Sequence, residues 1–286
     1  MPDTLIEPLE LATRLDDPSW AILDCRFELA RPAWGASAFA VGHIPNAQYA
    51  DLDGDLSGAR GARTGRHPLP EVNELAGLFG RLGIDAQVQV IAYDQGNGMY
   101  AARLWWLLRW LGHRQVAVLN GGFAAWERAG LPVSVRSVTR APRRFSAQVD
   151  PEAVASSAQV AELVAQGALK RGERVLVDAR AADRFAGENE TLDAVAGHVP
   201  GARNHPFATN LGSDGRFLEP RELHQRWERT LAGQPATRTI AMCGSGVTAC
   251  HNLLALEVAG LPGARLYAGS WSEWIRDPTH AVARGP

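Results

Sequence analysis

The sequence is poor in cysteine and lysine, and neither sign of charge is in marked excess. Its three cysteines, Cys25, Cys243 and Cys250, are an odd and sparse set, which argues against a disulfide framework and favours a reducing compartment. The 29 basic and 31 acidic residues leave a net charge of -2, which excludes nucleic-acid binding by bulk charge alone. Because Lys170 is the only lysine, any cation in an active site is expected to be an arginine, whose charge is fixed.

Long hydrophobic runs are also missing. The most apolar helix candidate, around residues 101–111, is interrupted by Arg103 and Arg109 and is too short to span a bilayer. The first ten residues carry Pro2 and acidic side chains where an export signal needs basic and then apolar residues. We therefore expect a cytoplasmic protein with no membrane and no nucleic-acid partner. The length of 286 residues favours about two domains.

Four short motifs occur twice along the chain, in the same order. The pairs are AILDCR and RVLVDAR, GHIP and GHVP, VQVIAYDQGNG and TRTIAMCGSG, and VAVLNGGFAAW and ARLYAGSWSEW. The offset between partners stays near 150 residues and falls by about six between the second and third pairs. The sequence therefore indicates two homologous halves, with the extra residues of the first half in the Gly- and Arg-rich loop 56–68.

Each half alternates short strand-like runs with helical segments. Examples are a strand near 88–93 with a helix over 101–112, and a strand near 239–242 with a helix over 247–260. This alternation predicts an α/β fold in which each half is a parallel sheet with helices on both faces. Ligands bind such sheets beyond the carboxyl ends of the strands, which is where Asp94 and Cys243 stand.

The halves are expected to be separate domains. Residues 136–149 are polar and basic without a clear period, and we interpret them as a linker between a domain at 1–135 and a domain at 150–286. Features that occur in both halves are interpreted as structural. These are the strand-ending residues Asp24 and Asp178 and the histidines His43 and His198.

The loop after Cys243 predicts a site for a reactive sulfur. Two glycines let the backbone curl so that successive N–H groups point inward, and a helix begins directly afterwards. The positive end of that helix favours an anion at the same spot. A thiolate is therefore stabilised there. The loop reads Cys243, Gly244, Ser245, Gly246, Val247 and Thr248.

Several other chemistries fit the loop poorly. A cysteine phosphatase needs an arginine six residues after the cysteine, and this chain has Ala249 there. A phosphate-binding P-loop needs a Gly-Lys-Ser/Thr sequence, and the only lysine of this chain, Lys170, does not stand in one. Cys243, Cys250 and His251 lack a standard zinc spacing. A papain-like pair with a spatially adjacent histidine stays open. We expect no metal and no cofactor.

With these motifs the chain resembles the two-domain rhodanese-type sulfurtransferases over essentially its whole length. The CGSGVTA loop is most similar to that of the 3-mercaptopyruvate sulfurtransferases, whereas thiosulfate sulfurtransferases usually carry a cationic loop. The resemblance implies tandem rhodanese-like domains and a catalytic second half. It also implies an inactive first half, in which Asp94 replaces the cysteine.

The resemblance further implies covalent sulfur transfer through a Cys243 persulfide. On this resemblance we expect the donor to be a small molecule, 3-mercaptopyruvate, and the acceptor to be cyanide, a thiol or a thioredoxin-like protein. Ser245, His67 and Asp53 match the residues that assist breakage of the carbon–sulfur bond. The resemblance also implies that the loop residues Gly244, Gly246, Val247 and Thr248 line the substrate site.

Arg184 matches the first substrate arginine of the family, and an arginine can bind a carboxylate bidentately. Mercaptopyruvate enzymes usually carry a second arginine nine residues later, but this chain has Asp193 there. Either another arginine such as Arg103 takes its place, or affinity for mercaptopyruvate is reduced.

Two other functions stay open. One is thiosulfate:cyanide sulfur transfer on the same scaffold, and the other is a non-catalytic rhodanese-like binding module. The intact Cys243 loop speaks against the binding module, because a degenerate module usually loses the nucleophile.

Overall fold

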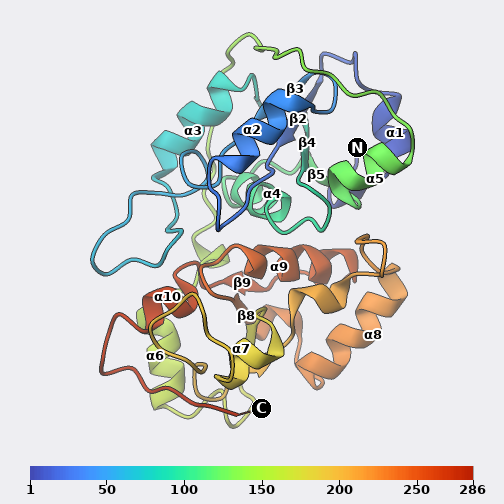
Figure 1. The fold of residues 1–286 in the computed structure, drawn as a ribbon. Helices are drawn as coiled ribbons and strands as arrows, with labels where there is room; N and C mark the ends of the chain where they lie inside the picture. The colour runs from blue at the N-terminus through green and yellow to red at the C-terminus, as the bar shows by residue number, and fades with distance from the viewer. Residues whose placement is uncertain (286) are drawn as a thin grey trace. The chain divides into compact units, whose positions relative to one another are not determined.

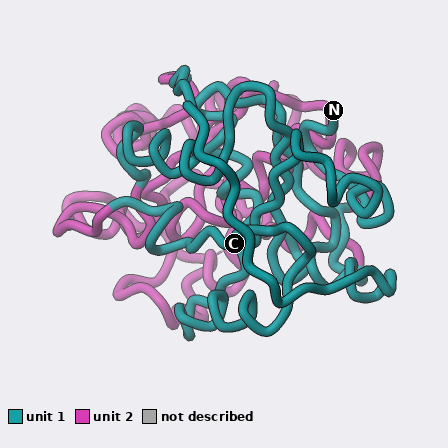
Figure 2. Tube along the Cα trace, turned by 90° about the horizontal axis from the view of Figure 1, so that it is seen from above, with its two compact units in different colours: residues 1–58, 69–150, 213–217 teal, residues 59–68, 151–212, 218–286 magenta. Residues whose placement is uncertain are grey.

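The computed structural model describes residues 1–285, which form two compact units. Unit 1 comprises residues 1–58, 69–150 and 213–217, and unit 2 comprises 59–68, 151–212 and 218–286. Figure 2 distinguishes the two units by colour along the chain. Each unit thus includes a short segment that comes from the other half of the sequence.

Unit 1 is built on a five-stranded sheet in the order β1-β5-β4-β2-β3 (Figure 1). Its strands are β1 (Leu5–Ile6), β2 (Trp20–Asp24), β3 (Ala47–Tyr49), β4 (Gln89–Tyr93) and β5 (Val116–Leu119). Its helices are α1 (Pro8–Ala12), α2 (Trp34–Val41), α3 (Val72–Arg81), α4 (Ala101–Trp110) and α5 (Gly122–Arg128).

Unit 2 is built on a four-stranded sheet in the order β7-β6-β8-β9. Its strands are β6 (Val175–Asp178), β7 (Arg203–Asn204), β8 (Thr239–Met242) and β9 (Arg265–Leu266). Its α-helices are α6 (Ser157–Ala165), α7 (Ala182–Ala186), α8 (Pro220–Leu231), α9 (Thr248–Val258) and α10 (Ser270–Trp274). Short 3-10 helices are η1 (Pro151–Ala153), η2 (Phe207–Asn210) and η3 (Ala236–Arg238).

All strand pairs in both sheets are parallel. A single parallel bridge between Val154 and Leu266 stands in unit 2 where the β1–β5 pair stands in unit 1. The two sheets therefore share one order, and the predicted α/β fold with tandem repeats is confirmed. The predicted strands near 88–93 and 239–242 are β4 and β8, and α4 and α9 follow them.

Helices cover both faces of each sheet, because the side chains of a strand alternate between faces. In unit 1, one face packs Ile22 and Ile91 against Leu11 of α1 and Trp126 of α5, while α4 contacts the other face. In unit 2, α6 and α10 share a core cluster with β6 and β8, whereas α9 packs on the other face and contacts α8. The central strands are buried throughout, as is usual for parallel sheets.

A buried aspartate–arginine pair follows a central strand in each unit. In unit 1, Arg26 Nη2 donates to Asp24 Oδ2 at 2.7 Å and to the Gly42 carbonyl oxygen at 2.6 Å. The equivalent residues in unit 2 are Arg180, Asp178 and Gly197, at 2.8 and 2.7 Å. Each pair ties a strand end to the glycine of a Gly-His motif, which agrees with the structural role expected for the repeated aspartates.

The repeated histidines are buried beside phenylalanine rings. His43 stacks on Phe39 and His198 stacks on Phe185, at ring-centroid distances of 3.9 and 3.8 Å. Each Nδ1 is hydrogen-bonded to the carbonyl oxygen of the same phenylalanine. These contacts fit the structural role expected for both histidines.

Candidate active site

Cys243 directly follows β8 and is buried in unit 2. Its Sγ accepts hydrogen bonds from the backbone N–H groups of Ser245, at 3.4 Å, and Gly246, at 3.1 Å. Gly246 has a φ of 77°, and a Cβ at this position would collide with the Ala268 carbonyl oxygen. The glycine is therefore required for the turn that aims these N–H groups at the sulfur, as the sequence predicts.

The start of α10 fixes the backbone of this loop. The Cys243 N–H donates to Ser270 Oγ at 3.0 Å, and the Trp271 N–H donates to the Cys243 carbonyl oxygen at 3.0 Å. The Ser272 N–H donates to the Gly244 carbonyl oxygen at 2.9 Å. Val247 is the N-cap of α9 and Thr248 is its first residue, so the N-terminus of the helix follows the loop directly.

His67 and Ser245 are hydrogen-bonded in unit 2, with 2.7 Å between His67 Nδ1 and Ser245 Oγ. Both residues are buried, with exposed fractions of 2% and 7%. His67 lies on the segment 59–68, which the Arg66 N–H anchors by donating to Ser272 Oγ at 3.0 Å. The structure thus brings together two of the predicted catalytic residues, separated widely in the sequence.

Arg184 lies beside the loop and is joined there by Arg66. The position that a Cβ of Gly244 would occupy is 2.8 Å from Arg66 Nη2 and 3.8 Å from Arg184 Nη2. The missing side chain of Gly244 therefore leaves room for both guanidinium groups. Arg184 Nη2 contacts Glu190 Oε1 at 2.8 Å and Asp193 Oδ2 at 3.3 Å, and Arg66 Nη1 contacts Asp193 Oδ1.

The family follows from comparison with known proteins. The family model described as "Rhodanese-like domain" matches residues 7–129 and 158–277, which together are most of the chain. The chain belongs to the rhodanese family. The two matched segments correspond to the two repeats, and Cys243 lies in the second of them.

The chain is similar over nearly its whole length to several named sulfurtransferases. A probable 3-mercaptopyruvate sulfurtransferase of Pseudomonas aeruginosa is 50% identical over 98% of each chain. A putative thiosulfate sulfurtransferase, SseB of Mycobacterium tuberculosis, is 39% identical over 98% of this chain and 97% of its own. The crystal structure of SseA from Escherichia coli, described as a 3-mercaptopyruvate sulfotransferase, matches with a TM-score of 0.80 and 33% identity. It is covered completely and covers 95% of this chain.

The first rhodanese repeat holds a carboxylate where the second holds sulfur. Asp94 follows β4 and is fully buried. Its two oxygens accept hydrogen bonds from four backbone N–H groups, namely those of Gly96, Gly98, Tyr100 and Ala101, at 2.9 to 3.3 Å. Burial raises the pKa of Asp94 above its ordinary value, and the four N–H bonds offset part of this effect. In both repeats the loop thus directs backbone N–H groups at the side chain that follows the strand.

Two other residues named from the sequence lie in unit 1. The Asp53 N–H donates to Asp51 Oδ1 at 3.0 Å, and the role of Asp53 beside His67 stays a prediction. Arg103, considered as a substitute for a second substrate arginine, is fully buried and donates from Nε and Nη2 to the Leu56 carbonyl oxygen at 3.3 Å. The arginine that lies beside Arg184 is Arg66 instead.

Sequence reasoning missed Arg66 and Glu190. Arg66 directly precedes the candidate His67 in the loop that the repeat comparison shows to be longer, and that position is the available signal. Glu190 lies six residues after Arg184, and nothing in the sequence marks it as a partner of that arginine. Both assignments depend on tertiary contacts.

Cys25 and Cys250 are buried core residues, and burial raises the pKa of Cys25 well above its ordinary value. No group of three histidine, cysteine, aspartate or glutamate side chains within residues 1–285 is arranged to hold a metal ion. In the same residues no helix has the length and hydropathy that crossing a membrane requires.

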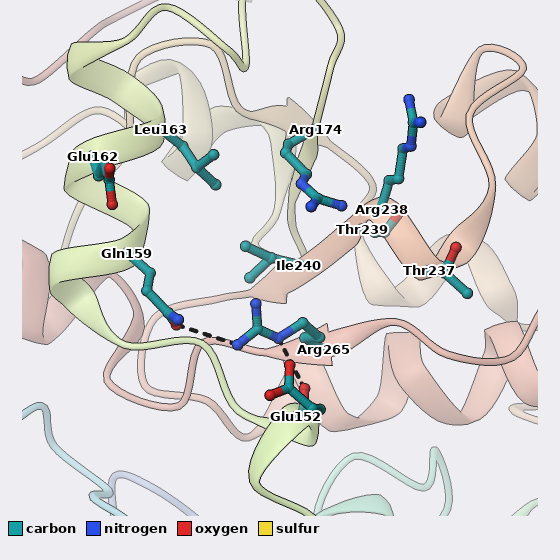
Figure 3. Close-up of a pocket in the computed structure, with 10 residues that line it drawn as sticks. All are labelled: Glu152, Gln159, Glu162, Leu163, Arg174, Thr237, Arg238, Thr239, Ile240 and Arg265. Atoms are coloured by element: carbon teal, nitrogen blue, oxygen red, sulfur yellow. Dashed lines mark hydrogen bonds between the residues drawn. The ribbon is translucent and has the colours of Figure 1, made fainter.

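A hollow at the other end of β8 is unrelated to the cysteine loop. It is lined by Thr239 and Ile240 at the start of the strand, together with Arg174, Arg265 and Glu152 (Figure 3). Arg265 is held by the Glu152 carbonyl oxygen at 2.8 Å and by Gln159 Oε1 at 3.2 Å. Ligands of parallel sheets bind beyond the carboxyl ends of the strands, so this hollow is not the active site.

Proposed function

We propose that this rhodanese transfers sulfur from 3-mercaptopyruvate to a thiophilic acceptor through a persulfide on Cys243. The observation that carries the proposal is the Cys243 sulfur, held by two backbone N–H groups beside the His67–Ser245 pair. The relatives named as mercaptopyruvate enzymes, at 50% identity and at a TM-score of 0.80, support the choice of donor.

In the first step the Cys243 thiolate attacks the sulfur of the donor. A sulfur–sulfur bond forms, the carbon–sulfur bond breaks, and its electron pair leaves with carbon as the enolate of pyruvate. The backbone N–H groups stabilise the negative charge on sulfur. In the second step an acceptor thiolate or cyanide attacks the outer sulfur, and Cys243 leaves as a thiolate.

The enolate must be protonated at carbon before it leaves as pyruvate. The Ser245 hydroxyl and the His67 imidazole, 2.7 Å apart, can move the proton that the donor thiol brings to that carbon. Asp53 is proposed to assist this transfer. Arg184 binds the donor's carboxylate, and Gly244, Gly246, Val247 and Thr248 line the site.

The first half of the chain is proposed to be a non-catalytic partner, because a carboxylate cannot accept sulfane sulfur at Asp94. We keep the division into 1–135, a linker at 136–149 and 150–286 as the proposed organisation of the sequence. A small thiol, cyanide or a thioredoxin-like protein is the proposed acceptor, and the cytoplasm is the proposed compartment.

Thiosulfate is the second candidate donor. The 39% identical relative from Mycobacterium tuberculosis carries that name, and the aspartate at position 193 departs from the mercaptopyruvate pattern. Comparing kcat/KM for the two donors decides between them. A clear preference for thiosulfate would overturn the choice of 3-mercaptopyruvate.

The persulfide is tested by mass spectrometry of the chain after incubation with donor alone. We expect a gain of one sulfur on the peptide that contains Cys243, and thiocyanate once cyanide is added. Cys243→Ser should abolish both signals, whereas Cys250→Ser, a matched control at a second buried cysteine, should keep them. Sulfur transfer that survives Cys243→Ser would contradict the mechanism, because the sulfur would then be carried by another group.

A further inference from the structure

The carboxylate of Asp193 lies between the two arginines beside the Cys243 loop. One of its oxygens contacts Arg66 Nη1 and the other contacts Arg184 Nη2. Its side chain is 4% exposed and each arginine side chain is 19% exposed, so solvent screens these contacts only in part. Asp193 therefore occupies the groups that an anionic donor needs.

The positive charges of the arginines beside the loop are already balanced by carboxylates of the chain, so no net positive charge is left for an additional anion. Arg66 and Arg184 face the carboxylates of Glu190 and Asp193. Arg180 nearby is paired with Asp178 and also contacts Glu190 Oε2 at 3.4 Å, so three arginines face three carboxylates. Burial acts to raise the pKa of Glu190, but the hydrogen bonds and charge of Arg184 and the backbone N–H groups of Leu192 and Asp193 together outweigh it. The pKa of Glu190 is therefore held below its ordinary value. Glu190 is thus ionised at neutral pH. An anionic donor therefore meets a net positive charge only when one of the two carboxylates, Glu190 or Asp193, moves away from the arginines.

The two carboxylates are held very differently. Glu190 makes four contacts of 2.8 to 3.3 Å with Arg184 and accepts from the backbone N–H groups of Leu192 and Asp193. Asp193 makes only one side-chain contact with each arginine, although both carboxylates lie in residues 187–197, a segment without helix or strand. Asp193 is the carboxylate that can exchange.

We propose that Asp193 is an internal ligand of the donor site, which the donor's carboxylate displaces to bind Arg66 and Arg184 together. The proposal rests on the proposed function in taking the donor to be a carboxylate. Arg66 supplies the second cation that residue 193 does not provide. After sulfur transfer, Asp193 competes with pyruvate for the same arginines and promotes its release.

The test measures anion binding and turnover separately, in the full chain. The probes are pyruvate and inorganic sulfate, titrated calorimetrically, and the variants are Asp193→Asn and Asp193→Ala. Without the competing carboxylate, both probes should bind about tenfold more tightly, which is the scale of one charge-assisted contact. The KM for mercaptopyruvate and the inhibition constant of pyruvate should fall in parallel.

Glu188→Gln is the matched control. It removes one negative charge from the same segment, but Glu188 is exposed and contacts neither arginine in the described residues. Its probe affinities should equal those of the unmodified chain. Adding Arg66→Ala to Asp193→Asn should cancel the gain in affinity, since Arg66 is then no longer available.

Unchanged or weaker pyruvate and sulfate binding by both Asp193 variants would overturn the proposal and make Asp193 a residue that positions the arginines. Failure of the proposed function gives a different result. If mercaptopyruvate is not the donor, no variant forms a persulfide with it, yet sulfate affinity still rises in Asp193→Asn.

Discussion

At the scale of single residues, the two repeats carry different side chains at equivalent positions, a carboxyl group at Asp94 and a thiol at Cys243. Asp94 and Cys243 each follow the central strand of a sheet and face backbone N–H groups. The cradle stabilises a fixed carboxylate in one repeat and a sulfur in the other. The residue that the cradle holds is therefore one of the differences that separate the two repeats chemically.

The His67–Ser245 pair predicts that the two donors respond differently to mutation. Only mercaptopyruvate leaves a carbanion that must be protonated, and a positioned acid–base group contributes roughly 100-fold or more to such a step. Ser245→Ala and His67→Gln should lower kcat for mercaptopyruvate by about that factor. Transfer from thiosulfate should lose much less, because its sulfur–sulfur bond breaks without a proton at carbon.

Steady-state kinetics with both donors check this prediction. Arg63→Ala is a suitable control, because Arg63 is an exposed residue of the same segment. An equal loss with both donors would show that the pair shapes the loop and does not move a proton.

At the scale of elements, one buried histidine, His205, follows β7 and contacts both α8 and η2 of unit 2. His205 Nδ1 is hydrogen-bonded to Thr230 of α8 at 2.7 Å, and Nε2 to Asn210 of η2 at 3.0 Å. Its ring stacks on Trp227 of α8, with a centroid distance of 3.8 Å. Burial lowers the pKa of His205 from 6.5 to about 4, with the charge of Arg226 adding to this effect.

This pKa shift predicts loss of stability in acid. The unfolded chain binds a proton on His205 more readily than the folded chain does, so the stabilisation is complete above pH 6.5 and is lost as the pH falls towards 4. The loss is on the order of 3 kcal/mol over this window. Urea unfolding across the window should show a smaller decline in His205→Gln. His224→Gln, at a half-exposed histidine of α8, should keep the full decline. A decline in His205→Gln equal to that of the unmodified chain would contradict the prediction.

At the scale of the whole molecule, the repeats are alike in fold and unlike in chemistry. Two residues after Cys243 stands Ser245, whereas two residues after Asp94 stands Gly96. Unit 2 also takes in residues 59–68, which bring His67 and Arg66 to the cysteine loop. A cysteine alone would therefore not make the first repeat a sulfur carrier.

This asymmetry predicts the labelling of Asp94→Cys. Incubated with mercaptopyruvate, this variant should still gain the mass of one sulfur per chain, on the peptide that contains Cys243. Intact-mass and peptide spectra make the measurement, with the unmodified chain as the reference. A second sulfur at position 94 would show that the backbone cradle suffices for the reaction.

The sequence by itself determined the tandem α/β repeats, the strands that precede Asp94 and Cys243, and the glycine loop, because these depend on local patterns and on internal repetition. It could not place Arg66 beside Arg184, pair Asp193 with both arginines, or assign residues 59–68 to unit 2. Only the tertiary structure decided these points, because they are contacts between residues far apart in the chain. Asp193 stands where the resemblance implies a second substrate arginine, and in the fold it is an ion-pair partner of Arg66 and Arg184.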